Sequence, residues 1–365
     1  MKISVVLGTR PEIIKMSPII RYLENIQENF FIIHTGQHYS YEMDKTFFNS
    51  LNLPTPKYNL DVGSGSHAEQ TGKIMIGIEN ILQIERPDVI LVQGDTNSVM
   101  AGAVTASKLH IPIGHIEAGL RSYDRRMPEE INRVIADHIS DYLFAPTKIA
   151  QENLLHEGIS QSKIFITGNT IVDAIHQNLK IGQQSENCLN RLHLLEKNYF
   201  LVTAHRAENV DDKERLMKII KGLCKIQKIY SLPVIFPIHP RTEKKIKGLG
   251  INLDRITIIP PQGFLEFLQL EANAKLILTD SGGVQEEACI LEVPCVTLRD
   301  STERPETIEV GANMLSGVEP ESIVRSTEKM LKASRSWKNP FGDGMASMKI
   351  VNILHGINQK MTNFR

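Results

Sequence analysis

The stretch KLILTDSGGVQEEA, residues 275–288, joins a short apolar run to a glycine turn and the start of a helical pattern. The turn itself is Ser281-Gly282-Gly283. Backbone N–H groups in the first turn of a helix have no intrahelical acceptor, and the helix dipole attracts negative charge there. Because glycines let a ligand approach closely, the stretch predicts an anion-binding turn between a strand and a helix.

Short β-rich runs of the same kind alternate with longer helical patterns along the whole chain. They cover residues 3–7, 30–34, 89–93, 111–115, 141–145 and 163–167, then 199–203, 233–238, 256–260, 275–279, 294–298 and 313–316. Apolar runs separated by helices are typical of parallel sheets. We therefore predict an α/β protein with two Rossmann-like, doubly wound domains.

The predicted domain boundary lies near residue 170, because the segment from 171 to 197 is polar. The expected domains are residues 1–170 and 171–344. A helix at 345–365 is expected to pack back on the first domain. A chain of 365 residues suits two domains, each large enough to bury a core.

Composition excludes several classes of function. The 41 basic residues balance 42 acidic ones, and the net charge of -1 favours neither nucleic acid nor an anionic membrane as a partner. No charge-free stretch of about 18 residues exists, so no membrane-spanning helix is expected.

The four cysteines form no C-x-x-C pair, which favours a reducing cytoplasm and no structural metal. The first strand-to-helix turn of the chain, LGTRPEIIK, has one glycine, whereas the dinucleotide-binding fingerprint G-x-G-x-x-G needs three. We therefore expect no nicotinamide cofactor, and no other cofactor.

Acidic residues follow several strands of the first half, at the sheet edge where α/β proteins bind ligands. They are Asp95, Glu117 and Glu129. As simpler interpretations, Asp95 is the N-cap of a helix beginning near Asn97, and either Glu129 or Glu130 only supports a helix start. Carboxylates that converge on one edge suit proton transfer on two faces of a substrate.

Two further interpretations concern the same edge. A metal held by His115, Glu117 and Asp95 lacks a tight spacing motif such as H-E-x-x-H. Around the first turn, a capping box of Thr9 and Glu12 explains those two residues but not Arg10. A guanidinium in a strand-to-helix turn is an anion ligand, and Lys15 is either a ligand or a solvated side chain.

The second half presents basic groups at its strand ends. His205 and Arg206 follow one run, and His239 and Arg241 follow the next. A buried, satisfied histidine is the simpler interpretation, but two strands ending in histidine near arginine suit phosphate recognition. An anion site facing carboxylates across an interdomain cleft predicts a nucleotide whose attached group is worked on by acids and bases.

The motifs LGTRPEIIK, TGQH, GDT, HIEAGLR, MPEEINR, TAHRAEN, TDSGGVQEEA and STERPE occur in this order over nearly the whole chain. The set resembles that of the non-hydrolysing UDP-N-acetylglucosamine 2-epimerases. The resemblance implies two Rossmann-like domains of the GT-B type, a homodimer, and an active site in the interdomain cleft. It also implies interconversion of UDP-N-acetylglucosamine and UDP-N-acetylmannosamine, in which UDP leaves to form a 2-acetamidoglucal and then returns.

The resemblance also implies roles for individual residues. The catalytic residues would be Asp95, Glu117, Glu129 and His205. UDP and sugar would be bound by Arg10, Lys15, Ser281, Gly282, Gly283, Glu287 and Arg304, with Glu287 on the ribose. A second, activating substrate molecule would be bound by Gln37, His38, Gln70, Arg206 and His239. This sequence departs from the family pattern at Ala207, where many relatives have arginine.

Four alternatives remain open from the sequence. A hydrolysing epimerase would release N-acetylmannosamine and UDP. A GT-B glycosyltransferase would move the sugar to an acceptor, and a nucleotide-sugar sensor would only bind. A further modified UDP-sugar, such as a diacetamido uronic acid, would use the same motifs.

Overall fold

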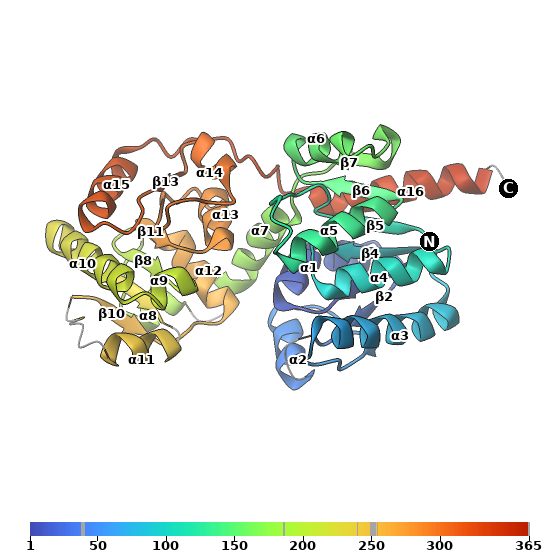
Figure 1. The fold of residues 1–365 in the computed structure, drawn as a ribbon, viewed down its shortest axis with the longest axis horizontal. Coiled ribbons are helices and arrows are strands. Elements are labelled where there is room, and N and C mark those ends of the chain that lie inside the picture. The colour runs from blue at the N-terminus through green and yellow to red at the C-terminus, as the bar shows by residue number, and fades with distance from the viewer. Residues whose placement is uncertain (38–40, 185–186, 239, 249–252, 254, 364–365) are drawn as a thin grey trace. The chain divides into compact units, whose positions relative to one another are not determined.

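The computed structural model describes residues 1–365 except 38–40, 185–186, 239, 249–252, 254 and 364–365 (Figure 1). The chain divides into two compact units. Unit 1 comprises Met1–Gln177 with Phe341–Arg365, and unit 2 comprises Asn178–Pro340. Each unit is built on one parallel sheet, so the predicted α/β fold with two parallel sheets is confirmed.

Unit 1 carries a seven-stranded sheet in the order β3-β2-β1-β4-β5-β6-β7. Its strands are β1 (Lys2–Leu7), β2 (Asn29–His34), β3 (Tyr58–Asn59), β4 (Val89–Gln93), β5 (Ile113–Ile116), β6 (Tyr142–Ala145) and β7 (Ile164–Ile166). Its helices are α1 (Arg10–Asn25), α2 (Tyr41–Ser50), α3 (His67–Glu85), α4 (Asn97–Lys108), α5 (Pro128–Ile139), α6 (Lys148–His156), the short η1 (Gln161–Lys163) and α16 (Ala346–Asn363). Strand β3 was not predicted, because two residues at a sheet edge are too short to give a period.

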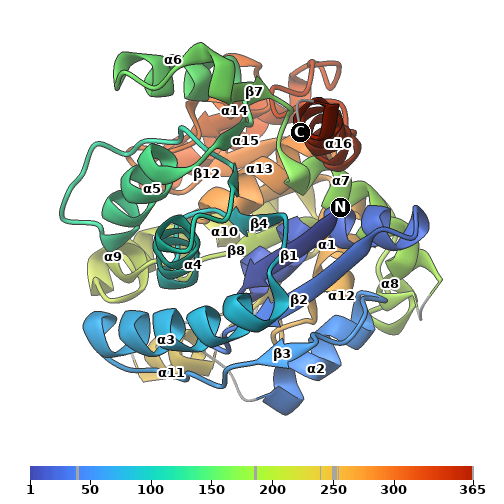
Figure 2. The same ribbon diagram turned by 90° about the vertical axis from the view of Figure 1, so that its right-hand side faces the viewer.

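The unit 1 sheet is covered on both faces, which explains its continuous apolar runs. Helices α3 and α4 lie side by side (Figure 2). Small residues of α4, Ala101 and Ala103, pack in a core with Ile74 and Ile78 of α3. The C-terminal helix α16 packs against α1.

Unit 2 carries a six-stranded sheet in the order β10-β9-β8-β11-β12-β13. Its strands are β8 (Phe200–Thr203), β9 (Val234–Pro237), β10 (Thr257–Ile259), β11 (Leu276–Thr279), β12 (Cys295–Thr297) and β13 (Asn313–Leu315). Its helices are α8 (Cys188–Arg191), α9 (Ala207–Val210), α10 (Lys213–Tyr230), α11 (Pro240–Gly248), α12 (Phe264–Asn273), α13 (Gly282–Ile290), α14 (Pro305–Glu309) and α15 (Pro320–Lys332). Helices α10 and α15 pack together, and a Cβ on Gly222 would lie 2.8 Å from the Ile323 Cδ1 atom, so glycine permits this close packing.

The strand order reverses once in each sheet, and these reversals decide where ligands bind. In unit 1, β2 and β4 flank β1, and in unit 2, β9 and β11 flank β8. Loops after the central strands diverge at such a point and leave a crevice at the carboxyl edge. The stretch at 275–288 is strand β11, a turn and helix α13, so it lies beside the reversal of unit 2.

Helix α7 (Thr170–Gln183) carries the chain from unit 1 to unit 2. The sequence placed the boundary near residue 170, whereas the division falls after Gln177. The first turn of α7 belongs to unit 1 because the Asp173 carboxylate accepts hydrogen bonds from Ala346 N at 3.2 Å and Ser347 N at 3.0 Å. These contacts anchor the start of α16 on unit 1. In the part of the chain that the structure describes, no helix is long and apolar enough to cross a membrane.

Candidate active site

Glu117 lies at the end of β5 in unit 1, on a backbone with φ of 69°. Its Oε1 accepts hydrogen bonds from Lys15 Nζ at 2.6 Å and from Asn169 Nδ2 at 3.3 Å. Its Oε2 accepts from Lys15 Nζ at 2.8 Å and from Gln93 Nε2. These donors come from α1, β4 and the turn after β7, so three separate segments fix the orientation of one carboxylate.

Lys15 is therefore not a solvated side chain. Its side chain is 18% exposed and its ammonium group pairs with Glu117. The interpretation of Lys15 as merely solvated is wrong. Because a buried carboxylate without a partner is costly, Lys15 both neutralises Glu117 and brings α1 to the same sheet edge.

Asp95 and Glu129 line one cavity of about 430 Å³, formed within unit 1 at the carboxyl ends of its strands. The Asp95 carboxylate is 35% exposed and pairs with the Arg133 guanidinium. The simpler interpretation of Asp95 as an N-cap is wrong, because the Thr96 hydroxyl caps α4 by accepting from Val99 N at 3.4 Å. The Asp95 carboxylate thus lines the cavity partly exposed, with the Arg133 guanidinium as its partner.

Of the two glutamates at the start of α5, Glu130 is the structural one. It is 4% exposed, and its carboxylate accepts from the backbone N–H groups of Ser122 and Tyr123, both at 2.9 Å. Glu129, in contrast, is exposed and lines the cavity. The first turn of α5 therefore separates one glutamate that holds a loop from one that faces the cavity.

Gln37 and Gln70 line the same cavity as the acids. Gln70 Nε2 donates to Gln37 O at 3.1 Å, and Ser98 Oγ donates to Gln37 Oε1 at 2.9 Å. Both glutamines are buried, so they form part of the wall of the acidic cavity. His38 and His239, expected in the same role, lie outside the described residues.

His115 does not ligate a metal. Its Nδ1 lies 2.7 Å from the Asp137 carboxylate and its Nε2 lies 2.8 Å from Gly94 O. Burial works to lower the pKa of His115, but the Asp137 carboxylate outweighs this effect and raises the pKa. Because both ring nitrogens lie against oxygen atoms of the fold, neither is directed to a metal beside Glu117 and Asp95, and the structure gives the metal interpretation no support. Nor do the described residues contain a group of three or more His, Cys, Asp or Glu side chains arranged to hold a metal ion.

The expected capping box at the start of α1 is not formed. Thr9 occupies the N-cap position but its side chain makes no capping hydrogen bond. Glu12 is 2% exposed and accepts from Gly8 N at 3.1 Å and from Thr96 Oγ1 at 2.9 Å. Burial raises the pKa of Glu12 to about 7. Arg10, one position after the cap, is half-buried and its guanidinium lies 5.3 Å from the centre of the Phe47 ring.

In unit 2, Ser281 is the N-cap of α13 and its Oγ accepts from Val284 N at 3.5 Å. Gly282 and Gly283 occupy the first two helical positions, where backbone N–H groups have no intrahelical acceptor. A Cβ on Gly282 would lie 2.4 Å from Glu303 Oε1, whereas a Cβ on Gly283 would meet nothing closer than 3.9 Å. A side chain at 282 would thus displace the Glu303 carboxylate, whereas a side chain at 283 would displace nothing.

The fully buried Asp280 shapes the loop that faces this turn. Its carboxylate accepts from His205 N at 3.1 Å, from Arg206 N at 3.0 Å and from Asn209 Nδ2 at 3.1 Å. The His205 imidazole is 58% exposed, with Nδ1 at 3.3 Å from Asp280 Oδ1. His205 is therefore not the buried, satisfied histidine of the simpler interpretation.

Two arginines of unit 2 make ion pairs near the glycine turn. Arg206 pairs with Glu303 at 2.6 Å, and Arg304 Nε lies 3.2 Å from Glu286 Oε1. Glu286 is 4% exposed, whereas Glu287 on the next position is half-buried. The two glutamates behind the turn thus have separate surroundings.

Sequence reasoning missed several residues that hold the site. Gln93, Asn169 and Asp280 bind the groups described above, and each lies at or just after the carboxyl end of a strand. The rule that singled out the acids would have found them. Glu303, which lies on no strand end, gave no such signal.

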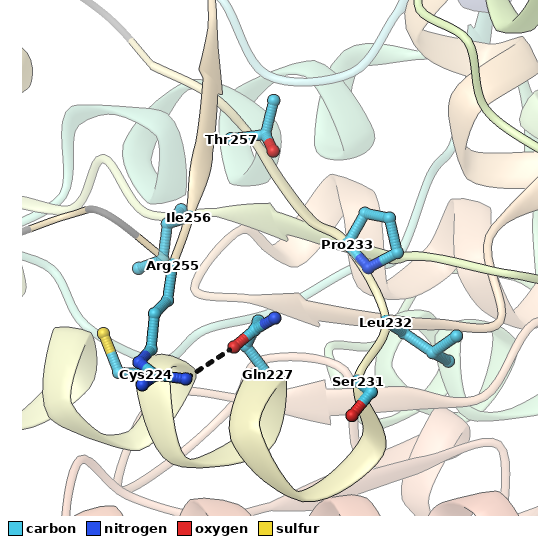
Figure 3. A pocket seen from close by; sticks show the side chains of 8 residues that line it. All are labelled: Cys224, Gln227, Ser231, Leu232, Pro233, Arg255, Ile256 and Thr257. Carbon is cyan, nitrogen blue, oxygen red and sulfur yellow. Dashed lines mark hydrogen bonds between the residues drawn. The ribbon is translucent and has the colours of Figure 1, made fainter.

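A second cavity, of about 890 Å³, lies in unit 2 beside the amino ends of β9 and β10 (Figure 3). It is lined by Cys224, Gln227, Ser231, Leu232, Pro233, Arg255, Ile256 and Thr257. None of the predicted site residues is among them. Ligands of such sheets bind at the carboxyl ends of the strands, whereas this cavity lies at their amino ends, so it does not suit the predicted chemistry.

Comparison with known proteins gives one consistent result. The family profile described as UDP-N-acetylglucosamine 2-epimerase matches residues 22–355. The UDP-N-acetylglucosamine 2-epimerase of Methanocaldococcus jannaschii is 61% identical over 362 residues, which cover 97% of this chain and 99% of the relative. A crystal structure of the Methanocaldococcus jannaschii enzyme in complex with UDP-GlcNAc and UDP matches with a TM-score of 0.84 at 61% identity, over 97% of this chain and 99% of that one. The UDP-2,3-diacetamido-2,3-dideoxy-D-glucuronate 2-epimerase of Pseudomonas aeruginosa is 43% identical over 97% of this chain and 99% of its own length.

Proposed function

Because this chain belongs to the UDP-N-acetylglucosamine 2-epimerase family, we propose that it interconverts UDP-N-acetylglucosamine and UDP-N-acetylmannosamine. The matched length supports this assignment, since the similarity extends over nearly all of both chains. The single structural observation that carries the proposal is the acidic set of unit 1. Glu117 is held by Lys15, Gln93 and Asn169, and Asp95 and Glu129 line a cavity at the same sheet edge.

The proposed reaction begins at carbon 1 of the sugar. The proton on carbon 2 has no neighbouring carbonyl group and is not acidic in the substrate. UDP leaves carbon 1 with the electrons of the C–O bond, and the positive charge that develops there acidifies the proton on carbon 2. A carboxylate removes this proton, and a double bond forms between carbons 1 and 2. Return of a proton to the other face of carbon 2, and of UDP to carbon 1, produces the epimer.

We assign the proton transfers to the carboxylates Asp95, Glu117 and Glu129. A pair of acids is needed because the proton leaves from one face of the ring and returns to the other. Glu117 is held in one orientation by its donors, which suits a group that must meet a defined C–H bond. Asp95 is partly exposed to the cavity, where a sugar would reach it.

We assign UDP to unit 2. The N–H groups of Gly282 and Gly283 at the start of α13 suit the diphosphate, and His205 beside them suits the charge that develops on the leaving oxygen. Glu287, one turn into the same helix, would accept hydrogen bonds from the ribose hydroxyls. Arg10 and Arg304 are further proposed ligands of the nucleotide-sugar.

Incubation with UDP-N-acetylglucosamine in heavy water, followed by proton NMR, tests this proposal. The expected product is UDP-N-acetylmannosamine that carries deuterium at carbon 2 with the nucleotide still attached. Free N-acetylmannosamine and UDP as main products would assign the protein to hydrolysis instead. Transfer to an added acceptor would make it a glycosyltransferase, and binding without turnover would leave only a sensor.

The Pseudomonas aeruginosa relative favours a second candidate substrate, UDP-2,3-diacetamido-2,3-dideoxyglucuronate. The motifs are common to both substrates, so a direct comparison of kcat/KM for the two sugars separates them. We expect the higher value for UDP-N-acetylglucosamine because the relatives with that name have the higher identity.

We further propose that the protein works in the cytoplasm, as its cysteine pattern indicates, and that it is a homodimer, as its resemblance to the family implies. Light scattering on the purified protein tests the dimer. Activation by a second substrate molecule is also proposed, through the residues that the resemblance implies: Gln37, His38, Gln70, Arg206 and His239. It predicts a sigmoidal dependence of the reverse reaction on added UDP-N-acetylglucosamine.

A further inference from the structure

Glu271 is a fully buried carboxyl group in the core of unit 2. It lies on α12, next to Leu270 of the apolar cluster that also contains Tyr199, Ala288 and Cys295. The catalytic proposal makes no use of it. A glutamate without exposure is rare unless it is paired, so its surroundings call for an explanation.

No N–H or O–H group of the described residues donates to either oxygen of Glu271. The Tyr199 hydroxyl, whose pKa is raised by burial and also by Glu271, instead donates to Leu270 O at 2.6 Å. The hydrogen-bonding contact that Glu271 does make is with the carboxyl group of Glu287 on α13. Two ionised carboxylates have no proton to donate and repel each other, so this contact requires a proton on one of them.

The surroundings place that proton on Glu271. The titratable groups that interact with Glu271 among the described residues are Glu287 of α13, Tyr199 before β8, and Cys295 of β12. None of them is a cation. Burial, followed by the charge of Glu287, raises the pKa of Glu271 well above its ordinary value. Glu287 is half-buried and reaches solvent more readily, so it is the partner that keeps the charge.

We propose that Glu271 remains protonated at neutral pH and donates a hydrogen bond to Glu287, which orients the Glu287 carboxylate for the ribose of UDP. Glu271 is thus a positioning residue for nucleotide binding, and this inference rests on the ribose role given to Glu287 in the proposed function. Ionised Glu271 would repel Glu287, so binding would weaken as the pH rises.

The test measures calorimetric affinities of the full-length protein for UDP and for 2′,3′-dideoxy-UDP. Glu271→Gln keeps a donor at the same place, and Glu271→Met has similar volume without one. We expect Glu271→Met to weaken UDP binding by about tenfold, the value of one hydrogen bond to a charged group. Binding of the dideoxy ligand, which cannot contact Glu287 through its ribose, should stay unchanged, and Glu271→Gln should retain the affinity of the wild-type protein for both.

The outcomes separate the inference from the function on which it rests. If Glu287→Gln leaves UDP affinity unchanged, the ribose role of Glu287 is wrong. If Glu287→Gln weakens UDP but Glu271→Met does not, only the positioning role is wrong. Equal losses for UDP and the dideoxy ligand in Glu271→Met would mean a general structural effect and would also overturn it.

Two further measurements report on the proton itself. An infrared spectrum at neutral pH should contain the carbonyl stretch of a protonated carboxyl group that is lost in Glu271→Gln, and its absence from the wild-type protein would overturn the proposal. UDP affinity of the wild-type protein should fall as the pH is raised above neutral, whereas that of Glu271→Gln should not. Parallel pH curves for the two proteins would contradict the assigned proton. Thermal unfolding of each variant verifies that it is folded.

Discussion

Replacement of Glu12 by glutamine should change how the stability of unit 1 depends on pH. Glu12 is 2% exposed, and its carboxyl group accepts from Gly8 N and Thr96 Oγ1. Burial raises the pKa of Glu12 from 4.5 to about 7, an effect that these hydrogen bonds only partly offset. The folded protein therefore binds the proton of Glu12 more tightly than the unfolded chain does.

The sign and size of the effect follow from this difference. Below the unfolded pKa of 4.5 both states are protonated and the stabilisation is fully present. As the pH rises from there through about 7, the unfolded state ionises first and the stabilisation is lost. Each tenfold difference in proton affinity corresponds to ~1.4 kcal/mol, so the total loss at pH 8 is ~3 kcal/mol. Glutamine does not titrate and should show no such loss.

Urea unfolding of wild-type protein and Glu12→Gln in parallel from pH 4.5 to 8 measures the effect. The informative quantity is the difference between the two free energies of unfolding at each pH, because the titration of all other groups cancels in it. We expect glutamine to become more stable relative to the wild type by ~3 kcal/mol across this range. A difference that stays constant with pH would refute the assignment of a buried, protonated Glu12.

Three further predictions concern Glu117, the glycine turn and the buried carboxylate of Asp137. Glu117→Gln should lower the rate of deuterium exchange at carbon 2 by ~100- to 10,000-fold and leave calorimetric UDP affinity nearly unchanged, because the carboxylate acts in proton transfer; loss of UDP binding would count against that role. Gly283→Ala should weaken UDP binding but keep the melting temperature of the wild type, since its Cβ would meet nothing closer than 3.9 Å. Gly282→Ala should lower the melting temperature even without ligand, because its Cβ would displace Glu303. Equal melting temperatures for the two variants would contradict this distinction. Asp137→Asn should lower the free energy of unfolding by ~3–5 kcal/mol, because His115 and Arg121 lose a buried partner, and a loss below ~1 kcal/mol would show that solvent reaches the pair.

Strands and helix starts were predictable from the sequence, because they depend on residues that are neighbours in the chain. Strand runs appear in the sequence because a parallel sheet buries both faces of every strand. The helix start at Ser281, Gly282 and Gly283 was predictable for the same kind of reason, since capping depends on neighbouring residues; anion binding by its backbone N–H groups stays a prediction. Tyr58–Asn59 was missed because two residues on a sheet edge carry no period.

Partners distant in the sequence were not predictable. Lys15 and Glu117 are separated by 102 positions, and only the order of β1, β4 and β5 brings them together. The same holds for Asp95, which the sequence favoured as the N-cap of α4. In the structure its carboxylate pairs with Arg133, and Thr96 is the N-cap. A strand-end rule identifies polar residues near the edge, but it says nothing of which ones pair.

The sequence by itself thus determined the fold class and the glycine turn at the start of a helix, because apolar periodicity and helix capping act over a few neighbouring residues, and its ordered motifs identified the family. Tertiary structure decided which ionisable groups are charged. In the sequence Glu12 is interpreted as part of a capping box and Glu271 carries no signal, yet both are buried in the folded chain. Charge depends on distance to solvent and to other charges, and these distances exist only once the sheet and its helices have packed.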